Sequence, residues 1–140
     1  MTNKNADLLY PELSYKIVGA VYAVWKNLGS GYKEVVYQKA LEREFENRGL
    51  CFTPQKIVPI IYEGKKVGAY TPDFVVDEKI ILELKHLPQL TFREKKQIWH
   101  YLKGTEYKLL ILVNFGGRDI EIIRWVYDKA RHAKRRGITR

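Results

Sequence analysis

Two carboxylates and one lysine stand at a spacing that could build a hydrolytic site. Asp73 follows a proline, and the run Glu83-Leu84-Lys85 begins ten residues later. Residues 79–85, KIILELK, are rich in apolar and β-branched types, and this pattern predicts a strand. Alternate residues of a strand point to the same face of a sheet. We therefore expect the side chains of Glu83 and Lys85 to project together.

A turn between the two motifs would bring the second carboxylate to the same place. Asp77-Glu78 precedes the strand and is typical of a turn. Because residue 78 lies midway between Asp73 and Glu83, an antiparallel return from that turn places Asp73 opposite the region of Glu83 and Lys85. Alternating Glu, apolar residue and Lys is also common on a solvated strand, so the ELK run alone indicates little. Asp73 at this distance makes a functional site the favoured interpretation.

Metal-assisted cleavage of phosphodiester bonds is the chemistry that such a group of side chains suits. Carboxylate oxygens bind Mg²⁺ or Mn²⁺, and an ion of this kind usually keeps several waters. The metal neutralises charge that develops on the phosphate, and a nearby ammonium can orient or help to deprotonate the attacking water. Burial favours a neutral, basic lysine, whereas adjacent carboxylates favour the charged form. For Lys85 both the base role and the orienting role therefore stay open.

The surrounding pattern predicts an α/β domain that positions this site. Apolar residues recur at helical spacing in three segments, and glycines follow the first two of them. Two apolar runs flank the polar turn at 63–66, which predicts a hairpin. Two apolar strands separated by a helix suggest a βαβ crossover inside a mixed sheet, and the last strand is expected at an edge. The expected elements are helices at 13–28 and 33–48, strands at 56–62, 67–76 and 79–85, a helix at 92–103, and strands at 107–115 and 120–127.

Three further motifs carry a resemblance to a known family. Residues 31–37, GYKEVVY, match the pattern Gly-xx-Glu-xx-Tyr, residues 97–101 place Gln four positions before Tyr, and residues 114–116 read Asn-Phe-Gly after an apolar strand. With Asp73 and the Glu83–Lys85 run, the motifs follow one another over nearly the whole chain. In these residues the chain resembles the GxxExxY protein family, which is similar to the PD-(D/E)XK nuclease superfamily and to its RecB-like branch.

The resemblance implies a fold and a set of metal ligands. The implied fold is a restriction-endonuclease-like αβββαβ core, in which helices flank a central mixed sheet. The implied ligands of Mg²⁺ or Mn²⁺ are Asp73, Glu83, the carbonyl of Leu84 and, on the first core helix, Glu34 as a ligand of the metal or of its water.

The resemblance also implies roles for the remaining site residues. Lys85 would be catalytic, and Glu34 would take part beside it. Gln97 would contact the metal site or a substrate phosphate, and Tyr101 would support Gln97.

An excess of positive charge favours a polyanionic partner. The 140 residues include 25 Lys and Arg against 16 Asp and Glu, which gives a formal net charge of +9. Such an excess attracts nucleic acid. No acid follows Asp128, so residues 129–140 form a basic tail that either contacts phosphate or only improves solubility. We expect nucleic acid, most of all DNA, as the partner, and the tail residues expected to bind it are Lys129, Arg131, Lys134, Arg135 and Arg136.

Composition predicts one globular domain, 1–128, followed by the basic tail. Hydrophobic residues make up 46% of the chain, which is ample for a core and excludes a disordered class. No apolar run is long enough to cross a membrane and no secretory signal is visible, so a cytoplasmic location is expected.

The single cysteine, Cys51, excludes an intramolecular disulfide and should be a small buried residue. The tryptophans at 25, 99 and 125 should belong to the core, and a homodimer is compatible with these features.

Three functional hypotheses follow. The first is a metal-dependent nuclease acting on DNA. The second is a catalytically silent nucleic-acid-binding module, and the third is an interaction subunit of a larger assembly. The intact set of Asp73, Glu83 and Lys85 favours the first hypothesis, because a silent module has no need to keep all three.

Overall fold

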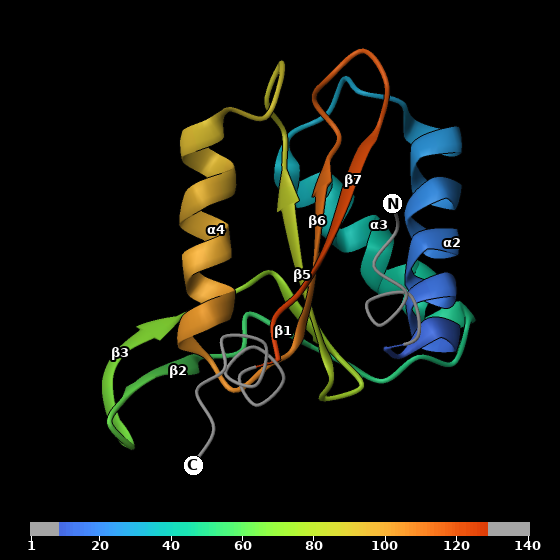
Figure 1. Cartoon of the computed structure of the whole chain (residues 1–140). Helices are drawn as coiled ribbons and strands as arrows, with labels where there is room; N and C mark the ends of the chain where they lie inside the picture. Colours follow the sequence, from blue (N-terminus) through green and yellow to red (C-terminus); the bar gives the residue numbers. More distant parts are fainter. Residues whose placement is uncertain (1–8, 129–140) are drawn as a thin grey trace.

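The protein is described by a computed structural model over residues 9–128. Helices cover both faces of a central sheet, and a two-stranded sheet projects beside them (Figure 1). The three predicted helices are confirmed as α2 (Pro11–Leu28), α3 (Glu34–Asn47) and α4 (Phe92–Gly104). The strands are β1 (Phe52–Pro54), β2 (Val58–Tyr62), β3 (Lys65–Tyr70), β4 (Phe74–Val76), β5 (Ile80–Lys85), β6 (Leu109–Asn114) and β7 (Glu121–Val126).

The central sheet is mixed and has the order β1-β4-β5-β6-β7. Strands β5 and β6 pair in parallel, and α4 makes the crossover between them, as the βαβ pattern predicts. The other pairings in this sheet are antiparallel, and β7 lies at an edge as expected. The observed architecture agrees with the expected restriction-endonuclease-like fold.

The prediction of one continuous strand over 67–76 is wrong. The segment is divided: β3 pairs with β2 in the separate two-stranded sheet, whereas β4 joins the central sheet between β1 and β5. Pro72 lies between the two strands and has no N–H to donate to a ladder, so the chain can change partners there. The three-residue strand β1 was not predicted, because it is too short for an alternating pattern to show.

Two layers of apolar side chains cover the two faces of the sheet. On one face Leu82 and Leu84 pack against α2 and α3, within a cluster that includes Ile17, Leu41 and Phe45. On the other face Ile81 packs with Ile98 and Leu102 of α4. Every residue of β6 is buried, as expected of a strand that is covered on both sides. The odd-numbered residues of β5 therefore face α4, and this face includes Glu83 and Lys85.

Several smaller predictions are settled by burial. Trp25, Trp99 and Trp125 are partly buried and pack against the two apolar clusters, so they lie at the margin of the core rather than inside it as predicted. Cys51 is exposed, so its predicted burial is wrong: it precedes an edge strand rather than lying inside one. The predicted phosphate-binding residues from Lys129 to Arg136 lie outside the described residues.

In the part of the chain that is described, helices are too short or too polar to span a lipid bilayer.

Candidate active site

A tight turn brings Asp73 beside Glu83. Asp77 and Glu78 both have positive φ (53° and 56°), and β4 and β5 leave this turn antiparallel, with Phe74 opposite Leu82. One step further along, the backbone N–H of Asp73 donates to Glu83 Oε1 at 3.3 Å. The predicted register is therefore confirmed.

The carboxylate of Asp73 is held at the end of β5. Its Oδ2 accepts a hydrogen bond from the backbone N–H of Leu84 at 2.7 Å, and its Oδ1 lies 3.5 Å from Nε2 of Gln55. The next carbonyl, that of Lys85, accepts from the N–H of Phe115 on the β6 side. Because successive carbonyls of a strand point to opposite sides, the Leu84 carbonyl points toward Asp73. The structure thus brings the three implied ligand groups of residues 73, 83 and 84 to one place.

Two stacked tyrosines support Glu83. The hydroxyl of Tyr70 donates to Glu83 Oε2. The ring of Tyr70 stacks on the ring of Tyr101, with centroids 4.3 Å apart and planes 5° apart. Tyr101, expected to support Gln97, instead reaches the carboxylates through Tyr70. Sequence reasoning missed Tyr70, because nothing in its position two residues before Pro72 distinguishes it from a packing residue.

The carboxylates perturb one another. Burial, and then the facing carboxyl of Asp73, raise the pKa of Glu83 from 4.5 to about 9, although Tyr70 and Lys85 act in the opposite direction. Partial burial of its carboxyl and the charge of Asp73 also raise the pKa of Glu34, although that residue as a whole is exposed. Lys85 and His86 partly offset this shift. The site therefore gathers more negative charge than its lysine compensates, which is a condition that attracts a cation.

Glu94 of α4 forms an ion pair with Lys85. Its Nζ lies 3.8 Å from Oε2 of Glu94, and the two side chains are 30% and 31% exposed. Glu94 lies in the first turn of α4, where its backbone N–H donates to the side chain of Thr91, the residue that caps the helix. Glu94 was not predicted, because an acid in a first turn is normally explained by the helix dipole.

Gln97 lies on the helix face that it shares with Glu94 and Tyr101, because positions 94, 97 and 101 are three and four residues apart. Its side chain is exposed, and within residues 9–128 it makes no hydrogen bond to the carboxylates. The structure therefore brings Glu34, Asp73, Glu83 and Lys85 together, with Tyr101 in indirect contact, and leaves Gln97 at the margin.

The tyrosine of the Gly-xx-Glu-xx-Tyr motif fixes the loop that precedes α3. The hydroxyl of Tyr37 donates to the Gly29 carbonyl at 2.5 Å and accepts from the N–H of Tyr32 at 3.3 Å. Its ring stacks between Phe115, at 4.3 Å, and His86, at 5.7 Å. This arrangement sets the start of α3, and with it the position of Glu34.

The Asn-Phe-Gly motif fixes the chain that leaves the site. Asn114 is buried, and its side chain bonds the backbone of Leu87 in both directions, with N–H to Oδ1 and Nδ2 to O both at 2.9 Å. A Cβ on Gly116 would lie 2.3 Å from the Leu87 nitrogen, so only glycine fits there. The structure shows a close approach of two backbones that extends the β5–β6 pairing beyond Lys85.

The donor set fits a hard divalent ion. Asp73 and Glu83 offer carboxylate oxygens beside the Leu84 carbonyl, which are the ligands that Mg²⁺ and Mn²⁺ prefer. In the described part of the chain, no three Asp, Glu, His or Cys residues lie close enough to enclose an ion alone. An ion there would keep waters or take phosphate oxygens, which is usual for Mg²⁺ at nucleic-acid and nucleotide sites.

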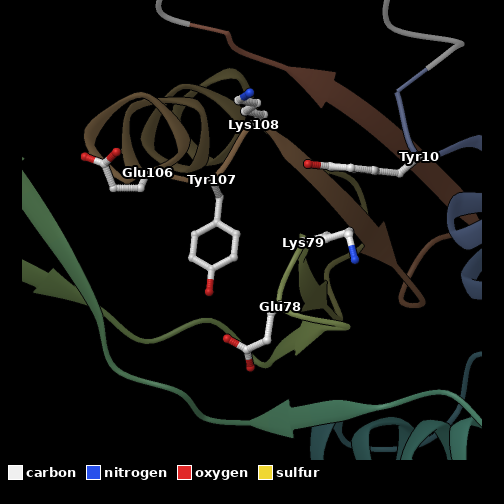
Figure 2. A pocket seen from close by; sticks show the side chains of 6 residues that line it. All are labelled: Tyr10, Glu78, Lys79, Glu106, Tyr107 and Lys108. Atoms are coloured by element: carbon white, nitrogen blue, oxygen red, sulfur yellow. The ribbon is translucent and has the colours of Figure 1, made fainter.

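A separate polar pocket lies at the other end of the sheet. Figure 2 shows the side chains of Glu78 and Tyr107 pointing into it. Because β5 and β6 are parallel, residues 78, 79 and 106–108 lie near their amino ends, while Lys85 and Asn114 close their carboxyl ends. This pocket is therefore not part of the candidate site. It is lined by Tyr10, Glu78, Lys79, Glu106, Tyr107 and Lys108.

The chain is similar to one protein family and to two solved structures. A family model described as the PD-(D/E)XK nuclease superfamily matches residues 11–125. Among solved structures, an alkaline exonuclease (LHK-Exo) from Laribacter hongkongensis is similar at 16% identity over 69% of this chain and 57% of its own chain, with a TM-score of 0.39. The protein SSO0001 is similar at 20% identity over 89% of this chain and 62% of its own chain, with a TM-score of 0.48.

The chain spans less than two thirds of either solved structure. No curated protein sequence matches it significantly. The family model, by contrast, covers most of the chain and includes the Asp73 and Glu83–Lys85 motifs. The chain belongs to the PD-(D/E)XK nuclease superfamily.

Proposed function

We propose that this protein is a metal-dependent nuclease that hydrolyses phosphodiester bonds in nucleic acid, with DNA as the main substrate. The observation that carries the proposal is the convergence of Asp73, Glu83 and Lys85 at the carboxyl end of β5. Membership of a nuclease superfamily supports the same reaction class.

Asp73, Glu83 and the Leu84 carbonyl would hold one Mg²⁺ or Mn²⁺, and Glu34 would orient a water bound to it. When bound, the metal supplies positive charge at the phosphate oxygens. Deprotonation of Glu83 must accompany binding, because its pKa is raised to about 9 without metal. The Tyr70 hydroxyl, held by the Tyr101 ring, orients one Glu83 oxygen throughout.

Lys85 would act on the attacking water or on the developing charge of the phosphate. Its ion pair with Glu94, at 3.8 Å, leaves the ammonium partly exposed and able to turn toward a substrate. Gln97 lies on the same face of α4 and would contact a phosphate at the edge of the site, consistent with its exposure.

Charge supports nucleic acid as the substrate. The net charge of +9 favours a polyanion, and the tail residues Lys129 to Arg136 would add phosphate contacts without sequence preference. The preference for DNA, a cytoplasmic location and a homodimer belong to the same proposal.

The test is a panel of labelled single-stranded, duplex, branched and RNA substrates, each incubated with Mg²⁺ and, separately, with Mn²⁺. The wild type should cut at least one DNA substrate, and Asp73→Asn should bind it without cutting. Asp77→Asn is the matched control, because it removes an acid in the neighbouring turn and Asn tolerates the positive φ there.

The result also separates the alternatives. If the wild type binds every substrate and cleaves none of them with either metal, that result would identify a silent binding module and contradict the proposed nuclease activity. Equal cleavage by the wild type and Asp73→Asn would contradict the assignment of Asp73 as a ligand of the metal.

A further inference from the structure

A second cleft lies on the opposite side of α4 from the carboxylates. Its volume is about 530 Å³, and its walls come from α4 and from the edge strand β7. Residues 94 and 101 of α4 face the carboxylates, whereas residues 92, 96 and 100 form a ridge on another side of the same helix. The residues that line the cleft are Phe92, Lys95, Lys96, Trp99, His100 and Trp125.

Three aromatic side chains line this cleft: Phe92, Trp99 and Trp125. Phe92 is 79% exposed, which is unusual for a large apolar side chain at the start of a helix. Trp99 makes T-shaped contacts with Trp125, with centroids 6.1 Å apart and planes at 67°, and with Tyr127, with centroids 5.6 Å apart and planes at 89°. The cleft thus offers the ring of Phe92 as a largely exposed apolar surface, beside the partly exposed indoles of Trp99 and Trp125.

The remaining lining residues are basic. Lys95 pairs with Glu121 at 3.7 Å, whereas neither Lys96 nor His100 takes part in an ion pair within residues 9–128. No acidic side chain lines the cleft. Aromatic faces bordered by lysines are the combination by which proteins bind unpaired nucleotides, because bases stack and the backbone is attracted by the cations.

We propose that this cleft binds unpaired nucleotides of a single-stranded segment of nucleic acid, with one base stacked on Phe92. The proposal rests on the proposed function only in taking nucleic acid as the substrate. Phe92 and Glu94 both lie in the first turn of α4, so a strand that leaves Lys85 reaches the cleft by crossing the amino-terminal end of this helix.

Charge argues against a second copy of the chain as the occupant. Each copy has a net charge of +9, and the lysines of the cleft would face a basic partner. The same reasoning excludes the chain's own basic residues after Asp128, whose charge has the same sign. A polyanion is the partner whose charge complements this surface.

The experiment compares the affinity of a short oligodeoxythymidylate with that of a duplex of equal length, in a chelating buffer that prevents cleavage. Phe92→Ala should weaken single-strand binding roughly five- to hundredfold, the range for removal of one stacking side chain. Phe92→Tyr should bind as the wild type does, because it keeps a flat ring, whereas Phe92→Leu should behave like Phe92→Ala.

Tyr15→Ala is the matched control. Tyr15 is an aromatic residue of α2 that is 81% exposed beside Lys16, far from α4 in the sequence. Its removal should leave affinity unchanged. Quenching of tryptophan fluorescence by the oligonucleotide should accompany binding, because Trp99 and Trp125 line the cleft.

Three results would overturn the proposal. They are single-strand affinity that is unchanged in Phe92→Ala, an equal loss in Tyr15→Ala, and a change of oligomeric state in Phe92→Ala that accounts for the loss. Failure of the nuclease proposal looks different: the wild type would bind single strands through Phe92 and cleave nothing with either metal.

Discussion

Replacement of Glu83 by glutamine should stabilise the metal-free protein, although it removes a ligand of the proposed metal. The Glu83 carboxyl is packed against that of Asp73, and its pKa is raised from 4.5 to about 9. Glutamine has the same shape, can accept the Asp73 N–H bond and carries no charge. It therefore removes the penalty for burying an acid beside another acid.

The magnitude follows from the two pKa values. At about pH 7 the unfolded chain has an ionised Glu83, whereas the folded chain must protonate it. The working pH of about 7 lies about 2.5 units above the pKa of 4.5 in the unfolded chain. At about 1.36 kcal/mol per unit, protonating Glu83 in the folded state therefore costs at most about 3.4 kcal/mol, which is the upper limit of the gain in Glu83→Gln. Because Glu83 is partly exposed and solvent screens it, we expect a gain of about 2 kcal/mol in the free energy of unfolding.

The sign of the pH dependence is also determined. Between pH 4.5 and about 9 the folded state binds more protons at Glu83 than the unfolded state does, so this contribution to stability is complete below 4.5 and is lost as the pH rises to about 9. The slope has a limit of about 1.4 kcal/mol per pH unit. Glu83→Gln has no such titration, so its advantage over the wild type should grow with pH.

Urea unfolding in a chelating buffer, at several pH values across this window, measures the effect. Glu106→Gln, which neutralises an exposed acid outside the candidate site, is the control and should follow the wild type. With Mn²⁺ the order should reverse: the wild type gains about 2.7 kcal/mol at a hundredfold excess over its Kd, and the mutant gains much less. A wild type that is as stable as Glu83→Gln at every pH would refute the raised pKa of Glu83, and with it the burial of this carboxyl beside Asp73.

Three other predictions test separate parts of the structure. Lys85→Ala should keep the fold and nucleic-acid affinity, measured in Ca²⁺, but lower single-turnover cleavage by about 10²–10³-fold, and full activity would contradict a catalytic role. Deletion of residues after Asp128 should weaken binding to all nucleic acids alike and flatten the dependence of affinity on salt, so an unchanged slope would exclude phosphate contacts. Gly116→Ala should destabilise the protein by about 1–3 kcal/mol in urea, because its Cβ would lie 2.3 Å from the Leu87 nitrogen, and wild-type stability would show that the two backbones can separate easily.

The parts of the fold that could be predicted depend on local pattern. The helices follow from apolar periodicity, and the approach of Asp73 to Glu83 follows from a turn centred on residue 78 and strict alternation along β5. Both are properties of short segments. The division of residues 67–76 depends instead on which strand each half pairs with, and a sequence pattern carries little information on that choice.

The supporting contacts of the site could not be predicted for a similar reason. Tyr70, Glu94 and Asn114 each reach the site from an element whose position is set by tertiary packing. Their residue types are ordinary for a strand end, a first helical turn and a strand end, respectively. Only the resemblance to the family's motifs drew attention to Asn114, and it assigned no function to this residue.

The bonds between Asn114 and Leu87 bear on the order in which the protein is made. They join residues 27 positions apart, and Asn114 is the last residue of β6. While the chain is being synthesised, the turn that pairs Asp73 with Glu83 can form as soon as β5 has left the ribosome, since it needs only neighbouring residues. The segment from Lys85 onward lacks its backbone bond to Phe115 and its bonds to Asn114 until β6 has followed and docked, and before that His86 holds it, through Ser30 and Tyr37. A nascent chain should therefore acquire its carboxylates first and an ordered lysine last, so that cutting activity arises only when the domain is nearly complete.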